Sequence, residues 1–356
     1  MKKLTTILFL LSTISSFAQN VTLNYKIISN RKTNAMHLSS QGKVYYDVKK
    51  SATTGTIKAT ILEPVKVVLV LNENMRKYYQ LWLHDGVYNV EINDSTHTIK
   101  FINSMLNDAY YAEKHTRDSL RVFEEAFEEQ LNAQNISVDE KTRLQAQTDS
   151  VENVVTNTGY DNLIKNPTTF LAIDFLRYHI GANDFNKQKL NNLFNKLPNE
   201  FKTFPTYTLC KEALAINKIY TVGDTLKDVN FKLSTGKYFN ACKDANGKYT
   251  YIDFHTGCKF KIKFYEEMKS TRKTLNQQIN FVSVSDETDY ATWLRYIKQD
   301  KTKWLNTCDF KGDLSPYHIQ FNVYEFPTGI LVNKQGVIIK NNIKEIDLTT
   351  LKNLLE

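Results

Sequence analysis

The first hundred residues show the two-residue alternation that is typical of half-buried β-strands. Apolar residues alternate with polar ones from Val21 to Ile27, which predicts a strand with one buried face. Further strands are expected at residues 56–62, 65–71, 78–83, 87–92 and 99–102. The pair Asp85-Gly86 separates two of these runs and predicts a β-hairpin between them. Residues 19–103 are therefore expected to form an antiparallel β domain, either a small sheet or a sandwich.

The apolar period changes to that of a helix between residues 104 and 220. Leu120, Phe123, Phe127 and Leu131 are spaced three and four residues apart, which predicts one apolar stripe along a helix. Ser137 followed by Glu140 fits a capping box at the start of a second helix. Shorter helices are expected at residues 170–178, 190–197 and 207–219. This part is expected to be a helical segment.

In the last part of the chain, residues 221–356, apolar strands alternate with helices. The expected strands are residues 231–233, 249–254, 279–284, 304–305, 329–332 and 337–340, and the expected helices are residues 262–275, 289–297 and 348–354. Strands that alternate with helices predict parallel pairing, and the last two strands would add an antiparallel hairpin. The whole chain is thus expected to be a multi-domain α+β protein with an α/β C-terminal domain.

The N-terminal residues resemble a secretory signal. Lys2 and Lys3 precede an apolar run from Leu4 to Ile14 that is too short for a stable membrane span, and cleavage is expected after Ala18. The signal peptide would then be residues 1–18 and the mature chain periplasmic or secreted; a retained N-terminal anchor is the alternative. No later apolar run approaches 18 residues, so no transmembrane segment is expected after cleavage.

Charge and cysteine content narrow the function classes. The formal net charge is +8, but the lysines are scattered and interleaved with Asp and Glu, whereas a nucleic-acid-binding protein would concentrate them. Nucleic acid is therefore not an expected partner, and without a phosphate-binding glycine loop no cofactor is expected. The four cysteines, which allow three full pairings, are Cys210, Cys242, Cys258 and Cys308, and no Cys-x-x-Cys motif occurs.

From about Tyr220 onward, the order of these elements and several local motifs resemble the exported bacterial thioredoxin-like, or thiol–disulfide interchange, family, in its peroxiredoxin-related branch. Many such proteins carry an N-terminal β domain of unknown function. The matching residues are Val222-Gly223-Asp224, Phe231-Lys232-Leu233, Gly236-Lys237, Gly247-Lys248-Tyr249, Ile252-Asp253-Phe254, residues 282–286, Trp293, Trp304, Phe326-Pro327-Thr328, residues 330–332 and residues 334–336. The resemblance implies a thioredoxin-like fold in which Pro327 is the family's cis-proline.

The active-site motif is where the chain departs from this family. The family has Trp-Ala-x-Trp-Cys-x-x-Cys after its central strand, whereas this chain has His255-Thr256-Gly257-Cys258-Lys259-Phe260-Lys261. If the turn is one residue shorter here, Cys258 takes the place of the attacking cysteine and Lys261 replaces the resolving one. If no gap is allowed, Cys258 takes the place of the second Trp and both cysteines are missing. In either alignment the Cys-x-x-Cys is degenerate.

A first hypothesis is a thiol–disulfide oxidoreductase that retains one local cysteine. Cys258 would be the nucleophile, since a helix N-terminus and nearby lysines favour a thiolate. A second thiol must resolve the mixed disulfide, and Cys308 is the candidate because it follows a strand expected to run parallel to that of Cys258. Phe326, Pro327 and His255 would border the groove that receives an extended protein thiol or disulfide substrate.

Three other classes of function compete with this hypothesis. The fold could have lost redox chemistry and now bind or scaffold a partner of the bacterial envelope, because a fold does not fix a function. A zinc site built on His255 and Cys258, with Cys308 or His318 added, would have suitable ligand types, but His-x-x-Cys is only half of such a site, and no metal is expected. A Ser-His-Asp hydrolase is disfavoured, because no Gly-x-Ser-x-Gly motif occurs.

Overall fold

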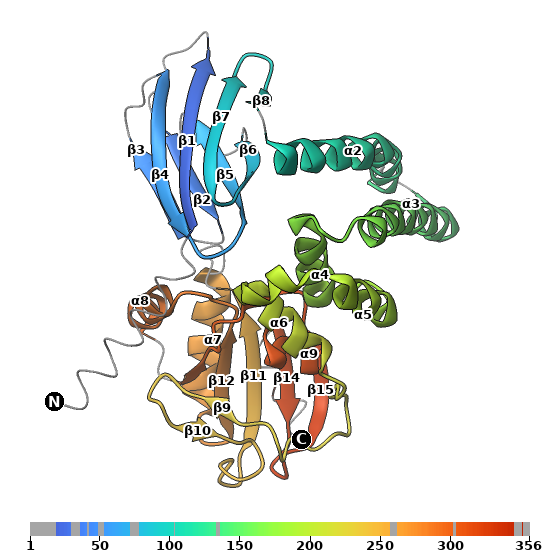
Figure 1. Ribbon diagram of the computed structural model, residues 1–356. Helices are drawn as coiled ribbons and strands as arrows, with labels where there is room; N and C mark the ends of the chain where they lie inside the picture. Colours follow the sequence, from blue (N-terminus) through green and yellow to red (C-terminus); the bar gives the residue numbers. More distant parts are fainter. Residues whose placement is uncertain are drawn as a thin grey trace, which may run out of the picture. The chain divides into compact units, whose positions relative to one another are not determined.

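The computed structural model describes residues 19–29, 36–40, 43–48, 53–71, 78–102, 104–132, 136–256, 262–301, 304–344 and 351. The chain divides into two compact units (Figure 1). One unit comprises Met1–Phe175 and Asn195–Tyr207, and the other comprises Leu176–Phe194 and Thr208–Glu356. The helical segment expected between residues 104 and 220 is thus shared between the units.

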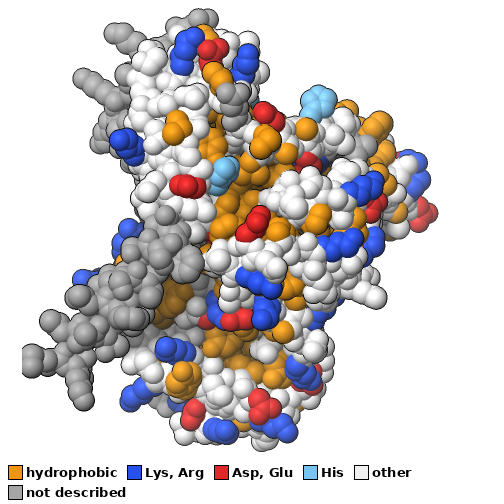
Figure 2. Space-filling model, viewed as in Figure 1, with side chains coloured by type: hydrophobic (Ala, Val, Ile, Leu, Met, Phe, Trp, Pro, Cys, Tyr) orange, Lys and Arg blue, Asp and Glu red, His pale blue; other side chains and the backbone are white. Residues whose placement is uncertain are grey.

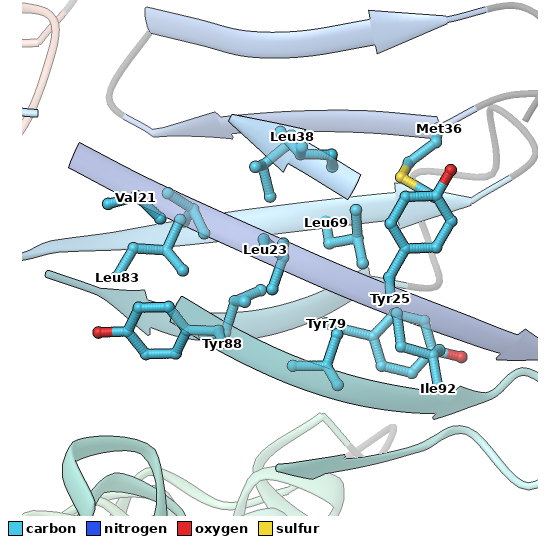
Figure 3. Packing of buried hydrophobic residues seen from close by; sticks show 14 of the residues in the cluster. Val21, Leu23, Tyr25, Met36, Leu38, Leu69, Tyr79, Leu83, Tyr88 and Ile92 are labelled. Carbon is cyan, nitrogen blue, oxygen red and sulfur yellow. The ribbon is translucent and has the colours of Figure 1, made fainter. Parts of the chain in front are cut away.

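The first unit contains two four-stranded sheets, with strand orders β4-β1-β7-β8 and β3-β2-β5-β6. The strands are β1 Gln19–Ile28, β2 Met36–Ser40, β3 Lys43–Val48, β4 Thr54–Ile61, β5 Val65–Leu71, β6 Tyr78–Leu83, β7 Gly86–Asn93 and β8 Thr98–Ile102. Buried residues of both sheets belong to one apolar cluster, in which Leu23, Leu38, Leu69 and Tyr88 take part (Figure 3). The two sheets therefore form a sandwich, as the alternating pattern predicted.

Two details of the predicted β domain were wrong. The strands on either side of Asp85-Gly86 do not form a hairpin, because β6 pairs with β5 and β7 pairs with β1 and β8. The turn instead leads from one sheet to the other, so that both strands direct apolar side chains into the shared core. The β1–β7 pair is also parallel, so the domain is not wholly antiparallel. Strands β2 and β3 were not predicted.

The helices that follow are α2 Met105–Leu131, α3 Val138–Lys165, α4 Phe170–Ala182, α5 Lys187–Lys196, the 3₁₀ turn Asn199–Thr203 and α6 Pro205–Leu214. The predicted cap of α3 is confirmed, because the Ser137 hydroxyl accepts a hydrogen bond from the Glu140 N–H. Helices α2 and α3 are long, but within the described ranges no helix combines the length and the apolar character needed to cross a bilayer.

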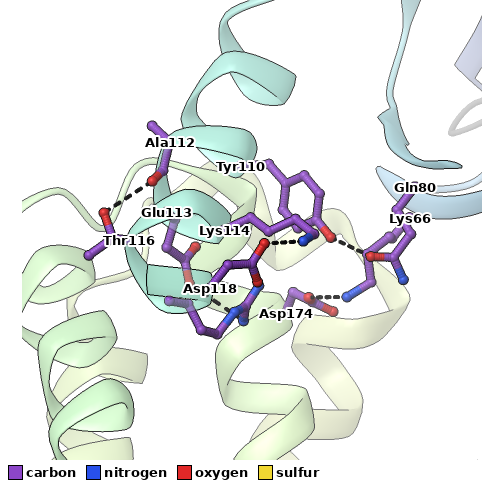
Figure 4. A network of polar contacts seen from close by, with 10 residues as sticks. Lys66, Gln80, Tyr110, Ala112, Glu113, Lys114, Thr116, Asp118 and Asp174 are labelled. Carbon is purple, nitrogen blue, oxygen red and sulfur yellow. Dashed lines mark hydrogen bonds and ion pairs between the residues drawn. The ribbon is translucent and has the colours of Figure 1, made fainter. Parts of the chain in front are cut away.

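A polar network ties α2 and the start of α4 to the sandwich (Figure 4). The Lys66 ammonium on β5 lies 3.3 Å from the Asp174 carboxylate on α4, and the Tyr110 hydroxyl on α2 donates to Gln80 on β6 at 2.7 Å. Burial raises the pKa of Glu113 in the same network, and Arg117 partly offsets this effect. These side chains fix the helices against β5 and β6 by direct hydrogen bonds and ion pairs.

The second unit is built on a five-stranded sheet with the order β13-β12-β11-β14-β15. Its elements are β9 Phe231–Lys232, β10 Tyr238–Phe239, β11 Tyr249–His255, α7 Ile262–Leu275, β12 Ile279–Ser285, α8 Tyr290–Asp300, β13 Leu305–Thr307, the 3₁₀ turn Gly312–Leu314, α9 Pro316–Gln320, β14 Thr328–Val332 and β15 Ile338–Ile343. β11, β12 and β13 are mutually parallel, whereas β14 and β15 are antiparallel. The predicted parallel core and antiparallel final hairpin are confirmed. The predicted last helix, residues 348–354, lies outside the described residues except for Leu351.

Both faces of this sheet are covered, so its central strands are almost continuously buried. Ile252 and Phe254 of β11 belong to one apolar cluster, and Tyr251 belongs to a second cluster on the opposite face. On the molecular face shown in Figure 2, basic and acidic side chains are interspersed, as the sequence suggested.

We predict that the sandwich core carries most of the stability of the first unit. Replacing Leu23, which is 1% exposed, with alanine should lower the free energy of unfolding by about 2–5 kcal/mol, because a buried cavity is left. The matched control is Val87→Ala. Because Val87 is 64% exposed, this substitution should lower the free energy of unfolding by less than about 1 kcal/mol. Urea denaturation of the full chain, followed by circular dichroism, measures both. Equal losses would contradict a single buried core between the sheets.

Candidate functional site

Strand register brings several of the predicted site residues to one edge of the five-stranded sheet. His255 is the last residue of β11 and pairs with Ser285 of β12. Val284 pairs with Thr307 of β13, so Cys308 follows at the same level as Ser285. Because the three strands are parallel, their carboxyl ends meet at this edge, where α/β folds place their sites.

The antiparallel strand β14 begins at the same edge. Thr328, its first residue, pairs with Phe254, so the preceding Pro327 is level with His255. The peptide bond between Phe326 and Pro327 is cis, as the resemblance implied for this proline. Phe326 and Pro327 are half-buried.

Cys258 lies outside the described residues. In the sequence it follows His255 by three residues and precedes the start of α7 at Ile262 by four. The strand that leads into this segment and the helix that follows it are both in place, as predicted from the sequence.

A buried carboxylate stands behind this edge. Asp253, on the central strand, is fully buried, and its Oδ2 lies 3.1 Å from Nδ1 of His255. The Ser283 hydroxyl donates to the same oxygen at 3.4 Å and accepts from the Trp304 indole N–H at 2.6 Å. Asp253, Ser283 and Trp304 thus form a buried hydrogen-bonded chain beside the His255 ring. An acidic residue inside an apolar strand was the sequence signal for it, because unpaired carboxylates are rarely buried.

Cys308 is held as a thiol. It is 5% exposed, and its Sγ donates a hydrogen bond to the Glu287 carbonyl at 3.1 Å. Burial raises its pKa to about 12, and Asp309, Asp286 and Glu287 add to the rise. At neutral pH its thiolate is therefore scarce, and the thiolate is the form that attacks disulfides.

His318 is a second buried histidine at this edge. Its ring packs against the rings of Phe254 and Phe326, with centroids 5.7 and 5.3 Å away. Nδ1 lies 3.0 Å from the Gly312 carbonyl, which only accepts, so Nδ1 carries the proton. Burial lowers the pKa of His318 to about 4; the bond to Gly312 opposes the shift and His255 adds to it. From the sequence, His318 is a candidate only as a metal ligand, and its burial among aromatic rings is not predicted.

The metal site weighed for these residues includes Cys258, which lies outside the described residues. Among the described residues, no three His, Cys, Asp or Glu side chains gather in a way that could hold a metal ion. His255 and Asp253 form a close pair, but neither Cys308 nor His318 completes a ligand set with them.

Comparison with known proteins finds solved structures that match part of the chain. No family model matches the chain, and no curated protein matches it. A thiol-disulfide oxidoreductase from Bacteroides fragilis is 24% identical, with a TM-score of 0.34, over 37% of this chain and 99% of that chain. StoA from Bacillus subtilis is 22% identical, with a TM-score of 0.31, over 36% of this chain and 96% of that chain. A thiol:disulfide interchange protein from a Bacteroides species is 22% identical, with a TM-score of 0.34, over 38% of this chain and 91% of that chain.

We predict that His318 makes the stability of the protein depend on pH in the acid range. The unfolded chain binds a proton on this residue below a pKa of about 6.5, whereas the folded chain resists it down to about 4. The free energy of unfolding should therefore fall by up to about 3 kcal/mol as the pH drops from 6.5 to 4. His318→Asn keeps a donor for Gly312 but does not titrate, so its stability should fall less over this range.

Denaturant unfolding at several pH values between 4 and 7 measures this difference. The control is His84→Asn, because His84 is exposed and should leave the wild-type pH dependence unchanged. Parallel pH curves for the wild-type chain and His318→Asn would show that His318 is not held neutral.

Proposed function

We propose that the protein is an exported, divergent thiol–disulfide oxidoreductase whose C-terminal domain carries Cys258 as the nucleophile. The observation that carries this proposal is the convergence at one sheet edge of the strand leading to Cys258, the loop of Cys308 and the cis Phe326–Pro327 bond. The signal-like residues 1–18 support a periplasmic or secreted location.

The proposed reaction begins with the Cys258 thiolate. Its sulfur forms a bond to one sulfur of a substrate disulfide, and the other substrate sulfur leaves as a thiolate. Lys259, Lys261 and the following helix α7 supply positive charge and N-terminal helix dipole that favour the Cys258 thiolate. Strand β11, which precedes this segment, is held by its pairing with β12 and β14.

Release of Cys258 requires a second thiol. Cys308 is at the right sheet edge, but its raised pKa and its bond to Glu287 disfavour attack. We therefore assign the second step to a thiol of another molecule, either a small thiol or a protein dithiol. Its thiolate attacks the substrate sulfur of the mixed disulfide and expels Cys258 as a thiolate. A further thiolate, from a second small thiol or from the same dithiol, then displaces the substrate sulfur as a thiolate, and the disulfide bond ends between the two external sulfurs. Cys308 is the internal alternative.

The substrate in this proposal is an extended protein segment that carries a thiol or disulfide. Pro327, Phe326 and His255 lie together at the sheet edge and would border the groove that receives this segment. His255 and Phe326 supply polar and apolar contacts, respectively, beside the sulfur.

The alternative function is a redox-inactive binding or scaffold domain of the bacterial envelope. Lys261 in place of a resolving cysteine, together with the protonated and buried state of Cys308, favours this alternative. The same groove would then hold a partner protein without sulfur exchange.

The two functions differ in their response to substitution of cysteine. We expect the Cys258→Ser substitution to lower the rate at which the mature chain reduces insulin disulfides. With glutathione as the second thiol, this rate should fall to the rate measured without protein. Cys308→Ser should retain the wild-type rate, because the second step uses an external thiol.

Activity that survives in Cys258→Ser would contradict Cys258 as the nucleophile. Loss of activity in Cys308→Ser, without loss of folding by circular dichroism, would make Cys308 the resolving thiol. A wild-type rate equal to the rate without protein would favour the binding alternative.

A further inference from the structure

A polar pocket opens beside the cis-proline segment, on the side of strand β15. Its volume is about 300 Å³, the lower end of the range for small-molecule sites. Glu325 and Thr328, which flank Phe326-Pro327, both line it. The pocket therefore adjoins the place where the proposed substrate segment would pass.

An irregularity in the sheet shapes this pocket. The register between β14 and β15 shifts between Gly329 and Leu331, so that an extra residue of β15 stands opposite Ile330. Asn341 and Asn342 lie at this bulge, and Asn342 has a positive φ of 54°. Bulges redirect side chains, often next to functional sites. Both asparagines line the pocket together with Ile330.

The charged groups of the pocket neutralise each other. The Lys344 ammonium lies 2.8 Å from the Glu325 carboxylate and donates to the Thr328 hydroxyl at 3.1 Å. A charged ligand group would have to compete with this ion pair. The pocket therefore favours a group that is polar but uncharged.

The remaining polar side chains of the pocket are three carboxamides and the hydroxyl of Tyr324. Asn322, Asn341 and Asn342 all line the pocket, and the Asn322 oxygen accepts from Asn183 at 2.6 Å, which leaves its amino group available as a donor. Each carboxamide offers both donors and acceptors. Buried Phe321 and Ile330 provide apolar surface below these groups.

We infer that this pocket selects the substrate by binding a side-chain carboxamide, from glutamine or asparagine, in the segment that passes Pro327. A carboxamide matches the paired donors and acceptors of Asn341 and Asn342, and its short apolar stem fits against Ile330. A carboxylate only accepts hydrogen bonds and an ammonium only donates them, so neither pairs with both groups of an exposed amide, and an aliphatic side chain pairs with neither. The inference rests on the proposed function only in placing an extended substrate beside Pro327.

The test uses fluorescein-labelled heptapeptides with a central serine where a substrate would carry cysteine. One variable residue, Gln, Glu, Lys or Leu, is placed in turn at each other position, and binding to the mature chain is measured by fluorescence anisotropy. In at least one register, the Gln peptide should bind about ten-fold more tightly than the other three. Asn341→Ala and Asn342→Gly should each reduce this preference to less than about three-fold.

Asn342→Gly keeps the positive φ, because glycine adopts it without strain. Its matched control is Asn246→Gly, which replaces another asparagine of positive φ, 50°, in a turn outside the pocket, and which should keep the full preference. Equal binding of all peptides, no binding of any, or a preference that survives in both pocket variants would overturn the inference.

The peptides contain no cysteine, so this measurement does not depend on sulfur exchange. A chain that prefers Gln peptides but reduces no disulfide would retain the carboxamide pocket and lose the oxidoreductase function. A chain that reduces disulfides without any peptide preference would retain the oxidoreductase function and lack selection by the carboxamide pocket.

Discussion

Burial of the central strand on both faces is the constraint on which the C-terminal unit depends. β11 packs against one apolar cluster through Ile252 and Phe254 and against another through Tyr251. A carboxylate on such a strand cannot reach water, so its hydrogen bonds must come from neighbouring side chains. Asp253 meets this requirement at one oxygen, Oδ2, which accepts from the Ser283 hydroxyl and lies 3.1 Å from Nδ1 of His255. Burial likewise raises the pKa of Cys308 and lowers the pKa of His318, so one physical cause favours the neutral form of both groups.

The sequence was most informative where local pattern and tertiary burial agree. The alternation from Val21 to Ile27 and the Ser137 cap both correspond to observed contacts. The hairpin predicted at Asp85-Gly86 was wrong, because two strands joined by a tight turn can belong to different sheets when both face one core. At the site, strand order predicted the edge shared by His255 and Cys308. The pKa of Cys308 and the pairing of Asp253 depend on burial and on neighbours distant in sequence, which periodicity does not reveal.

The edge of the sheet combines features of an enzyme with features of a binding domain. In the proposed function its strand ends and Pro327 would provide the framework for thiol exchange, whereas Lys261 stands where the resemblance puts a second cysteine. A single reactive thiol that depends on an external partner reconciles these features. In such a protein, specificity must come from contacts next to the sulfur. The carboxamide-lined pocket beside Glu325 and Thr328 is placed to provide them.

The most direct test of a single reactive thiol is the rate at which each cysteine of the folded, mature chain is alkylated, measured by peptide mass spectrometry across pH 6 to 9. Cys258 should react as a thiolate at a pH below the pKa of about 8.5 of an ordinary cysteine. Cys308 should remain protected until the chain is unfolded, because it is buried and its pKa is about 12. A Cys258–Cys308 disulfide in the oxidised protein, or a Cys258 that reacts no faster than Cys308, would contradict the account.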